Sequence, residues 1–248
     1  MKWSTAYKHI YGQQLFPKEL RDGLISPENL GQHLARKAAI LCPGSSLSRL
    51  HFPRNEYQRV LGINLAAAAE LEITDVLFER LSLEEYGNAQ YRIIKFLAKN
   101  SPSVSIYAKN IWSKTNFASD RLAEVAEFTN LLLDIPLRGG GFLSKNMVLE
   151  YLKNDAVGFS NWKSSLFVAI TLLRLQGVNA IDIFGIGEPG YFWEQPCAFD
   201  IIERDSLAHV RSRQTHDTEL GRHKVSDILK AFIDDIQENC SVEINILQ

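Results

Sequence analysis

Short apolar runs alternate with segments of helical character along most of this chain, and this alternation restricts the folds open to it. The apolar runs are residues 38–42, 60–63, 75–78, 103–107, 131–135, 180–184 and 242–247. Helices are predicted from residue 65 onward and at 90–99, 119–128, 164–176 and 226–238. Short strands that are apolar on both faces and separated by helices are typical of a covered parallel sheet. We therefore predict an α/β, Rossmann-like fold with a mostly parallel sheet, helices on both faces and a small lid segment.

The length and the absence of a linker predict one domain. The chain has 248 residues, which suits a single core, and it contains no internal repeat or low-complexity tract. Ser26 and Pro27 precede a further predicted helix at 27–37, because serine caps helices and proline suits the first helical position. We interpret residues 1–248 as one domain, with 188–222 as its lid.

Charge and cysteine content exclude several classes of protein. The formal net charge of -2 argues against a nucleic-acid partner. The three cysteines have neither disulfide nor metal-ligand spacing, so we expect reduced thiols, a cytoplasmic location and no bound metal. No run reaches the roughly 18 apolar residues that a membrane span needs. These features predict a soluble protein, and they leave peripheral contact with the inner membrane and the oligomeric state open.

The turn after the first apolar run is the first candidate binding element. It comprises Pro43, Gly44, Ser45 and Ser46, between Cys42 and Leu47. Backbone N–H groups and serine hydroxyls in such a turn can face a phosphate. The alternative is an ordinary strand-to-helix turn, and the run matches neither a dinucleotide fingerprint nor a P-loop.

Polar residues follow the next two apolar runs. Asn64 offers both a donor and an acceptor, which suits a ribose hydroxyl or a base edge, although it could equally be a helix N-cap. Asp75, Glu79 and Arg80 indicate either the rim of a cleft or a solvated surface.

Two serines and a lysine precede the most apolar predicted helix. Lys163, Ser164 and Ser165 would suit a phosphate or carboxylate at a positive helix end, and helix capping by either serine is the alternative. The helix itself closes at Gly177.

The last third of the chain offers a loop and three histidines. Residues 187–199 are aromatic and rich in turn formers, as a substrate-covering loop would be. His209, His216 and His223 are each candidates for a general base that deprotonates a sugar hydroxyl.

Taken in order, these motifs resemble those of the small, single-domain bacterial sialyltransferases that use CMP-sialic acid. The resemblance covers roughly residues 38–248. It rests on the turn at 42–47, on Asn64, on Ser164-Ser165-Leu166 with the following helix, on Gly185-Ile186-Gly187, on Ala198-Phe199-Asp200 and on Gly221-Arg222-His223-Lys224. Residues 157–160 and the helix after them also look similar to transferases of Kdo, another acidic sugar activated by CMP.

The resemblance implies a metal-independent glycosyltransferase without a cofactor, acting in bacterial surface polysaccharide synthesis. Its partners would be a CMP-sugar donor and a glycan acceptor. His223 would be the catalytic base, and the donor would be bound by Pro43, Gly44, Ser45, Ser46, Asn64, Ser164, Ser165, Gly187 and Glu188.

The chain departs from the family pattern at three positions. Leu166 replaces a glycine, Gly187 replaces an acidic residue for which Glu188 or Glu194 would have to serve, and Pro43 replaces an amide side chain. Two alternatives stand beside the transferase. One is a pterin-type pyrophosphokinase, whose sheet begins with a similar Gly-Pro-Ser turn and which needs ATP and magnesium. The other is a non-catalytic relative that binds a nucleotide or sugar, as Leu166 and Gly187 suggest.

Overall fold

A computed structural model describes a large part of the chain. The described residues are 24–25, 35–49, 53–69, 72–109, 118–132, 134–136, 159–161, 164–186, 190–191, 219–220 and 223–247. Four α-helices lie in these ranges: α2 (Glu85–Asn100), α3 (Ser119–Ala126), α5 (Ser165–Leu175) and α6 (Val225–Cys240). Three short 3₁₀ helices accompany them: η3 (Ser45–Arg49), η4 (Arg54–Glu56) and η5 (Asn64–Ala68). None of the helices in these ranges is long and apolar enough to cross a bilayer.

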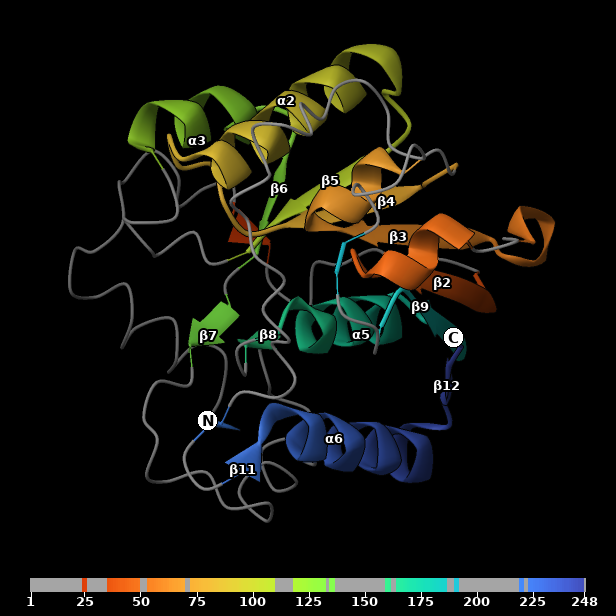
Figure 1. Ribbon diagram of the computed structural model, residues 1–248. Helices are drawn as coiled ribbons and strands as arrows, with labels where there is room; N and C mark the ends of the chain where they lie inside the picture. Colours follow the sequence, from red (N-terminus) through yellow and green to blue (C-terminus); the bar gives the residue numbers. More distant parts are fainter. Residues whose placement is uncertain are drawn as a thin grey trace.

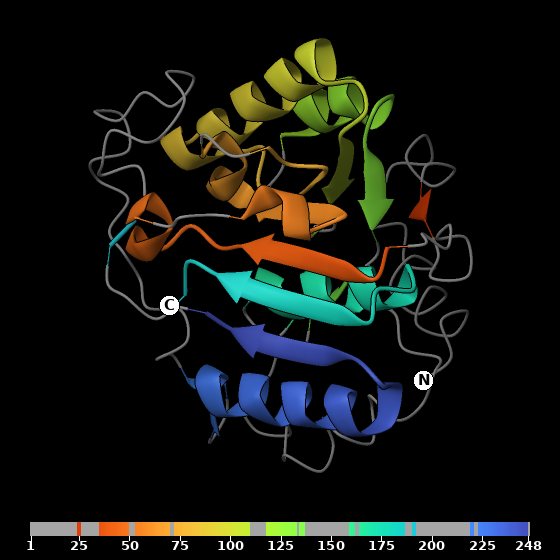
Figure 2. The ribbon, with the colours of Figure 1, turned by 90° about the vertical axis from the view of Figure 1, so that its right-hand side faces the viewer.

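The main sheet has eight described strands. In spatial order they are β1 (Leu24–Ile25), β6 (Asn130–Leu132), β5 (Ser105–Ala108), β4 (Asp75–Phe78), β3 (Arg59–Ile63), β2 (Lys37–Leu41), β9 (Ala180–Phe184) and β12 (Glu243–Ile246). Every neighbouring pair is parallel. Figure 2 shows β2, β9 and β12 side by side with their arrows in one direction. The predicted parallel α/β fold is confirmed.

Two small sheets complete the described strands. β7 (Asp134–Pro136) pairs in parallel with β8 (Phe159–Asn161), and β10 (Glu219–Leu220) pairs antiparallel with β11 (His223–Lys224).

Helices cover both faces of the main sheet (Figure 1). The core on one face includes side chains of α2 and α3, and the core on the other includes side chains of α5 and α6. Strands covered on both sides need apolar residues throughout, and residues 38–41 of β2 are accordingly all buried.

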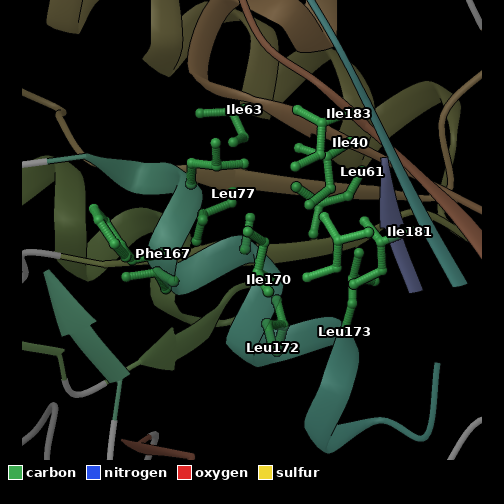
Figure 3. Packing of buried hydrophobic residues seen from close by; sticks show 14 of the residues in the cluster. Ile40, Leu61, Ile63, Leu77, Phe167, Ile170, Leu172, Leu173, Ile181 and Ile183 are labelled. Atoms are coloured by element: carbon green, nitrogen blue, oxygen red, sulfur yellow. The ribbon is translucent and has the colours of Figure 1, made fainter. Parts of the chain in front are cut away.

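Helix α5 lies between the sheet and α6. Figure 3 shows Phe167, Ile170 and Leu173 of α5 in one buried cluster with strand residues that include Leu61 and Leu77. On its outer side the Phe167 ring meets the Phe232 ring of α6 edge-on, with centroids 5.1 Å apart. A helix buried on both sides is apolar all round, which explains its composition.

Three sequence predictions differ from the structure. Residues 131–135 contribute to two strands, β6 and β7, in different sheets. The helix predicted from residue 65 is the 3₁₀ helix η5, whose residues are all buried and fold back onto β3, where a Cβ on Gly62 would lie 3.0 Å from the Ala67 Cα. Lys37, predicted as the end of a helix, begins β2.

The order of the strands reverses between β2 and β9. From β2 the chain passes over the face of α2 and α3 toward β3, and Leu47 and Tyr57 belong to the core on that face. From β9 it reaches β12 through α6, on the opposite face. Open α/β sheets bind ligands beyond the carboxyl ends of the strands at such a switch point. The fold thus indicates where a binding site should lie.

Candidate functional site

The turn after β2 contacts the end of β9 through backbone. Gly44 N–H donates to the Gly185 carbonyl at 3.0 Å, and a Cβ on Gly44 would lie only 2.3 Å from that oxygen. Gly185 has a φ of 75°, and a Cβ there would lie 2.1 Å from the Cys42 carbonyl oxygen. Glycine is required at both positions because any side chain would separate the two strand ends.

The same turn carries a buried hydroxyl with no hydrogen-bond partner, the Oγ of Ser46. Seven buried side-chain atoms of the described residues have no hydrogen-bond partner, and this one is of interest because it lies in the predicted phosphate turn at the switch point. Pro43, Gly44 and Ser45 are half-buried around it. The structure thus brings the four predicted turn residues together at the switch point.

Asn64 follows β3 at the same edge of the sheet. Its φ of 53° is left-handed, a conformation that asparagine tolerates better than most residues. It is the first residue of η5, and the N-cap position belongs to Ile63, so the capping alternative is wrong. The side-chain Oδ1 is buried and has no partner, while Nδ2 faces Glu79 Oε1 at 3.5 Å.

Glu79 follows β4, and its carboxylate accepts hydrogen bonds from side chains of two further elements. Lys109, which follows β5 and is fully buried, places Nζ 2.7 Å from Glu79 Oε2. Ser165 Oγ, at the start of α5, donates to the same oxygen at 3.1 Å. Burial by itself raises the pKa of Glu79, but Lys109 and Ser165 outweigh it and hold the pKa below its usual value. Glu79 is therefore an ionised carboxylate at neutral pH.

The backbone after β4 is held by Gln90 of α2. Its Oε1 accepts from the N–H groups of Glu79 and Arg80, at 3.3 and 3.1 Å. Gln90 is 1% exposed, so this contact fixes the end of β4 from inside the core.

The two serines at the start of α5 have different partners. Ser164 is the N-cap of α5, and its Oγ accepts from the Leu166 N–H at 3.3 Å, as the capping alternative predicted. Ser165 contacts Glu79 instead. The start of α5 lies at the carboxyl edge because the helix runs antiparallel to the strand that follows it, β9.

Two tyrosines approach this edge. Tyr191, from the predicted aromatic loop, forms an isolated antiparallel bridge with Gly44. Burial raises the pKa of Tyr86, and the charge of Glu79 adds to the rise. Tyr191 contributes to the same shift. Tyr191, the part of the predicted loop that the structure describes together with Gly190, therefore lies beside the turn after β2.

Several predicted residues cannot be placed. Gly187, Glu188, His209, His216, the 198–200 motif and most of the lid at 188–222 lie outside the described residues. The backbone of His223 is described as part of β11, immediately before α6, and its side chain is not. The chain passes from α6 into β12, which is parallel to β9. Helix α6 therefore runs opposite to the strands, and its start, with His223 just before it, lies toward the carboxyl edge.

The predicted cluster of Asp75, Glu79 and Arg80 is divided by β4. Glu79 and Arg80 follow the strand at the site, whereas Asp75 begins it at the opposite edge. There Arg59 Nε donates to Asp75 Oδ2 at 2.9 Å, and both side chains are buried. Asp75 is therefore structural.

Lys109 was missed by sequence reasoning, although its place directly after an apolar run was the available signal.

Comparisons with known proteins found similarity in structure alone. No family model matches the chain, and no curated protein matches it. The sialyltransferase CstII from Campylobacter jejuni, in complex with the substrate analogue CMP-3FNeuAc, is a structural neighbour with a TM-score of 0.48 and 16% identity over 86% of this chain and 81% of that one. An α-2,3-sialyltransferase from Campylobacter jejuni in apo form has a TM-score of 0.48 and 16% identity over 88% and 77% of the two chains.

These neighbours belong to the family whose motifs the sequence resembles. The site described above is defined by the contacts of this chain's own residues.

Proposed function

We propose that this protein is a glycosyltransferase of the sialyltransferase kind, which transfers an acidic sugar such as sialic acid or Kdo from a CMP-activated donor to a glycan. The observation that carries the proposal is the pair of buried, unpartnered side-chain oxygens, Ser46 Oγ and Asn64 Oδ1. They follow adjacent parallel strands at the carboxyl edge, next to the switch point. Both belong to the motifs on which the resemblance to CMP-sugar transferases rests.

The turn after β2 is suited to the phosphate of the donor. Gly44 and Gly185 keep this turn against β9, and Ser46 supplies a hydroxyl that needs a partner. Asn64 supplies an acceptor one strand away, where the ribose or base would lie. Gly187 and Glu188 follow β9 in the sequence and would complete this end of the site.

Leu166, which replaces the family's glycine, is a core residue of α5. Its side chain is 2% exposed and belongs to the core between α5 and the sheet, together with Ile63 and Leu77. The leucine side chain therefore contributes to the core at the start of α5.

In the proposed reaction His223 acts as general base. It removes the proton from an acceptor hydroxyl, whose oxygen then forms a bond to the anomeric carbon of the sugar. The bond from that carbon to the phosphate oxygen breaks, and CMP leaves with the bonding electron pair. This chemistry requires no redox partner, and we propose that it proceeds without a metal ion.

The biological setting is also a proposal. The acceptor would be a growing bacterial surface polysaccharide, modified in the cytoplasm or at the inner face of the membrane. We propose the whole chain as one domain, with residues 188–222 as the lid over the donor.

A transfer assay tests the proposal. Purified protein is incubated with CMP-sialic acid or CMP-Kdo and a panel of glycans, and release of CMP and glycan product are both measured. We expect His223→Ala to lose transfer while still binding CMP, and His9→Ala, outside the resemblance, to behave like wild type. Unchanged turnover in His223→Ala would reject that base, and His216→Ala would then be tested. Hydrolysis or transfer of neither donor would contradict the function.

A further inference from the structure

Three elements create a position at the site that would attract an anion. Lys109, at the end of β5, has a fully buried ammonium group. Ser165 is the first residue of α5, an 11-residue helix whose N-terminus carries partial positive charge. Buried cations and helix N-termini bind phosphates and carboxylates. We call this place, formed by Lys109, Ser165 and the start of α5, the anion position.

The protein fills the anion position with its own carboxylate. Glu79 Oε2 accepts from Lys109 Nζ at 2.7 Å and from Ser165 Oγ at 3.1 Å. A ligand phosphate or carboxylate placed here would meet the negative charge of Glu79 at short range. The expected role of Ser165 as a direct phosphate contact is thus taken by an internal contact.

Asn64 extends this arrangement toward the open edge. The residue is 7% exposed, and its Nδ2 is directed at Glu79 Oε1, 3.5 Å away. With the amide nitrogen turned toward the carboxylate, Oδ1 lies on the other side of the amide group, where it is buried without a partner. A buried acceptor of this kind requires a donor. Both Glu79 and Asn64 therefore offer acceptor oxygens at this end of the site.

We propose that Glu79 is a built-in anion that selects hydrogen-bond donors, so that the ligand meets Glu79 and Asn64 through neutral hydroxyl groups and not through its phosphate or carboxylate. This inference rests on the proposed nucleotide-sugar donor, and it assigns an orientation to it. The ribose or sugar hydroxyls lie at the ends of β3 and β4. The phosphate lies at the turn after β2, near Ser46.

Calorimetric titration with CMP and cytidine tests the orientation. Cytidine has the same base and ribose as CMP but lacks the phosphate. We expect Glu79→Gln to weaken binding of both ligands by a similar factor, about 10 to 100, because a charged acceptor for hydroxyls is lost. Glu84→Gln, a matched change at an exposed residue just before α2, should alter neither affinity.

Two outcomes would overturn the proposal. Tighter binding of CMP relative to cytidine in Glu79→Gln would show that the phosphate uses the anion position and that Glu79 merely obstructs it. Unchanged binding of both would show that Glu79 does not face the ligand. Should Glu79→Gln fail to fold, Glu79→Asp retains the negative charge but shortens the side chain by one methylene group, and the same equal weakening is expected.

Inorganic phosphate separates this inference from the proposed function. If wild type binds neither CMP nor cytidine, the proposed function fails, but the filled anion position can still be tested. Glu79→Ala removes both the charge and the side chain from that position, so this variant should gain phosphate-dependent thermal stabilisation that wild type lacks. Absence of this gain would overturn the assignment of Glu79 as an internal anion.

Discussion

The backbone N–H of Gly44 donates to the carbonyl oxygen of Gly185 at 3.0 Å, which joins the turn after β2 to the end of β9. Neither residue can carry a side chain without moving the other strand end, since the built Cβ positions lie 2.3 Å and 2.1 Å from backbone oxygens. This contact holds the turn that carries Ser46 at the switch point of the sheet.

Gly185→Ala is expected to damage both stability and binding. A φ of 75° costs a non-glycine residue about 1–3 kcal/mol. The alanine Cβ would also collide with the Cys42 carbonyl oxygen, and the turn after β2 would have to move to relieve that collision. Urea unfolding and CMP titration measure the two effects. Gly177→Ala is the control: Gly177 also has a positive φ, of 86°, but follows α5 at the opposite edge. Gly177→Ala should lose stability but keep its affinity for CMP. An equal loss of CMP affinity in both variants would contradict the role of the contact between Gly44 and Gly185.

Asp75→Asn should destabilise the protein strongly without affecting the site. Asp75 is fully buried with Arg59 at the amino edge of the sheet, and removing one charge leaves the guanidinium unpaired. Breaking a buried pair typically costs about 3–5 kcal/mol. The matched change Glu124→Gln removes an exposed partner of Lys95 and should have a much smaller effect on stability, because solvent screens exposed ion pairs. A small effect of Asp75→Asn on unfolding, or a specific loss of CMP affinity, would reject the structural role.

Asp182 is expected to make stability depend on pH. Burial alone would raise the pKa of its carboxyl, but hydrogen bonds from Asn245, Tyr57 and Lys37 hold it below the usual value. The contacts measure 3.0 Å from Asn245 Nδ2, 2.8 Å from Tyr57 Oη and 3.0 Å from Lys37 Nζ. Because folding lowers this pKa, its contribution is present above the unfolded value of about 4 and is lost as the pH falls through the folded pKa.

The corresponding measurement is urea unfolding of wild type and Asp182→Asn between pH 7 and pH 3. At pH 7 the variant should lose about 1–3 kcal/mol, because three donors lose a charged acceptor. This difference should shrink as the pH falls below about 4. A difference that stays constant across the range would show that ionisation of Asp182 does not stabilise the fold.

The Cys42 thiol should be unreactive in the folded protein. It is 6% exposed at the end of β2, and burial raises its pKa to about 12. Iodoacetamide at mildly alkaline pH should therefore spare Cys42 while modifying the half-buried Cys240, and should modify both in urea. Peptide mass spectrometry distinguishes the sites. Rapid native modification of Cys42 would indicate that the end of β2 opens.

Much of the fold could be predicted from the alternation of apolar runs and helices. The runs at 38–42 and 180–184 became central parallel strands, since each is apolar on both faces. The prediction was wrong where local pattern and packing disagree. Residues 65–68 are good helix formers, yet they belong to a short 3₁₀ helix because the whole segment is buried against Gly62.

The site was only partly predictable. The turn at Pro43–Ser46 and Asn64 were candidates because turn-forming or polar residues follow apolar runs directly, and the structure places them at the ends of adjacent strands. The pairing of Glu79 with Lys109 depends on β4 and β5 being neighbours, which joins residues 30 positions apart in the sequence. Ser165 reaches Glu79 because α5 lies across that end of the sheet, a relation that no local pattern reveals.

The most direct test of the central claim is a calorimetric titration of the wild-type protein with CMP, UMP, GMP and ATP, first with magnesium and then with a chelator. The account predicts that CMP alone binds tightly, that chelation leaves its affinity unchanged, and that Asn64→Ala weakens it up to about tenfold, the equivalent of one hydrogen bond. ATP binding that requires magnesium, or binding of none of the four nucleotides, would contradict the CMP-sugar transferase.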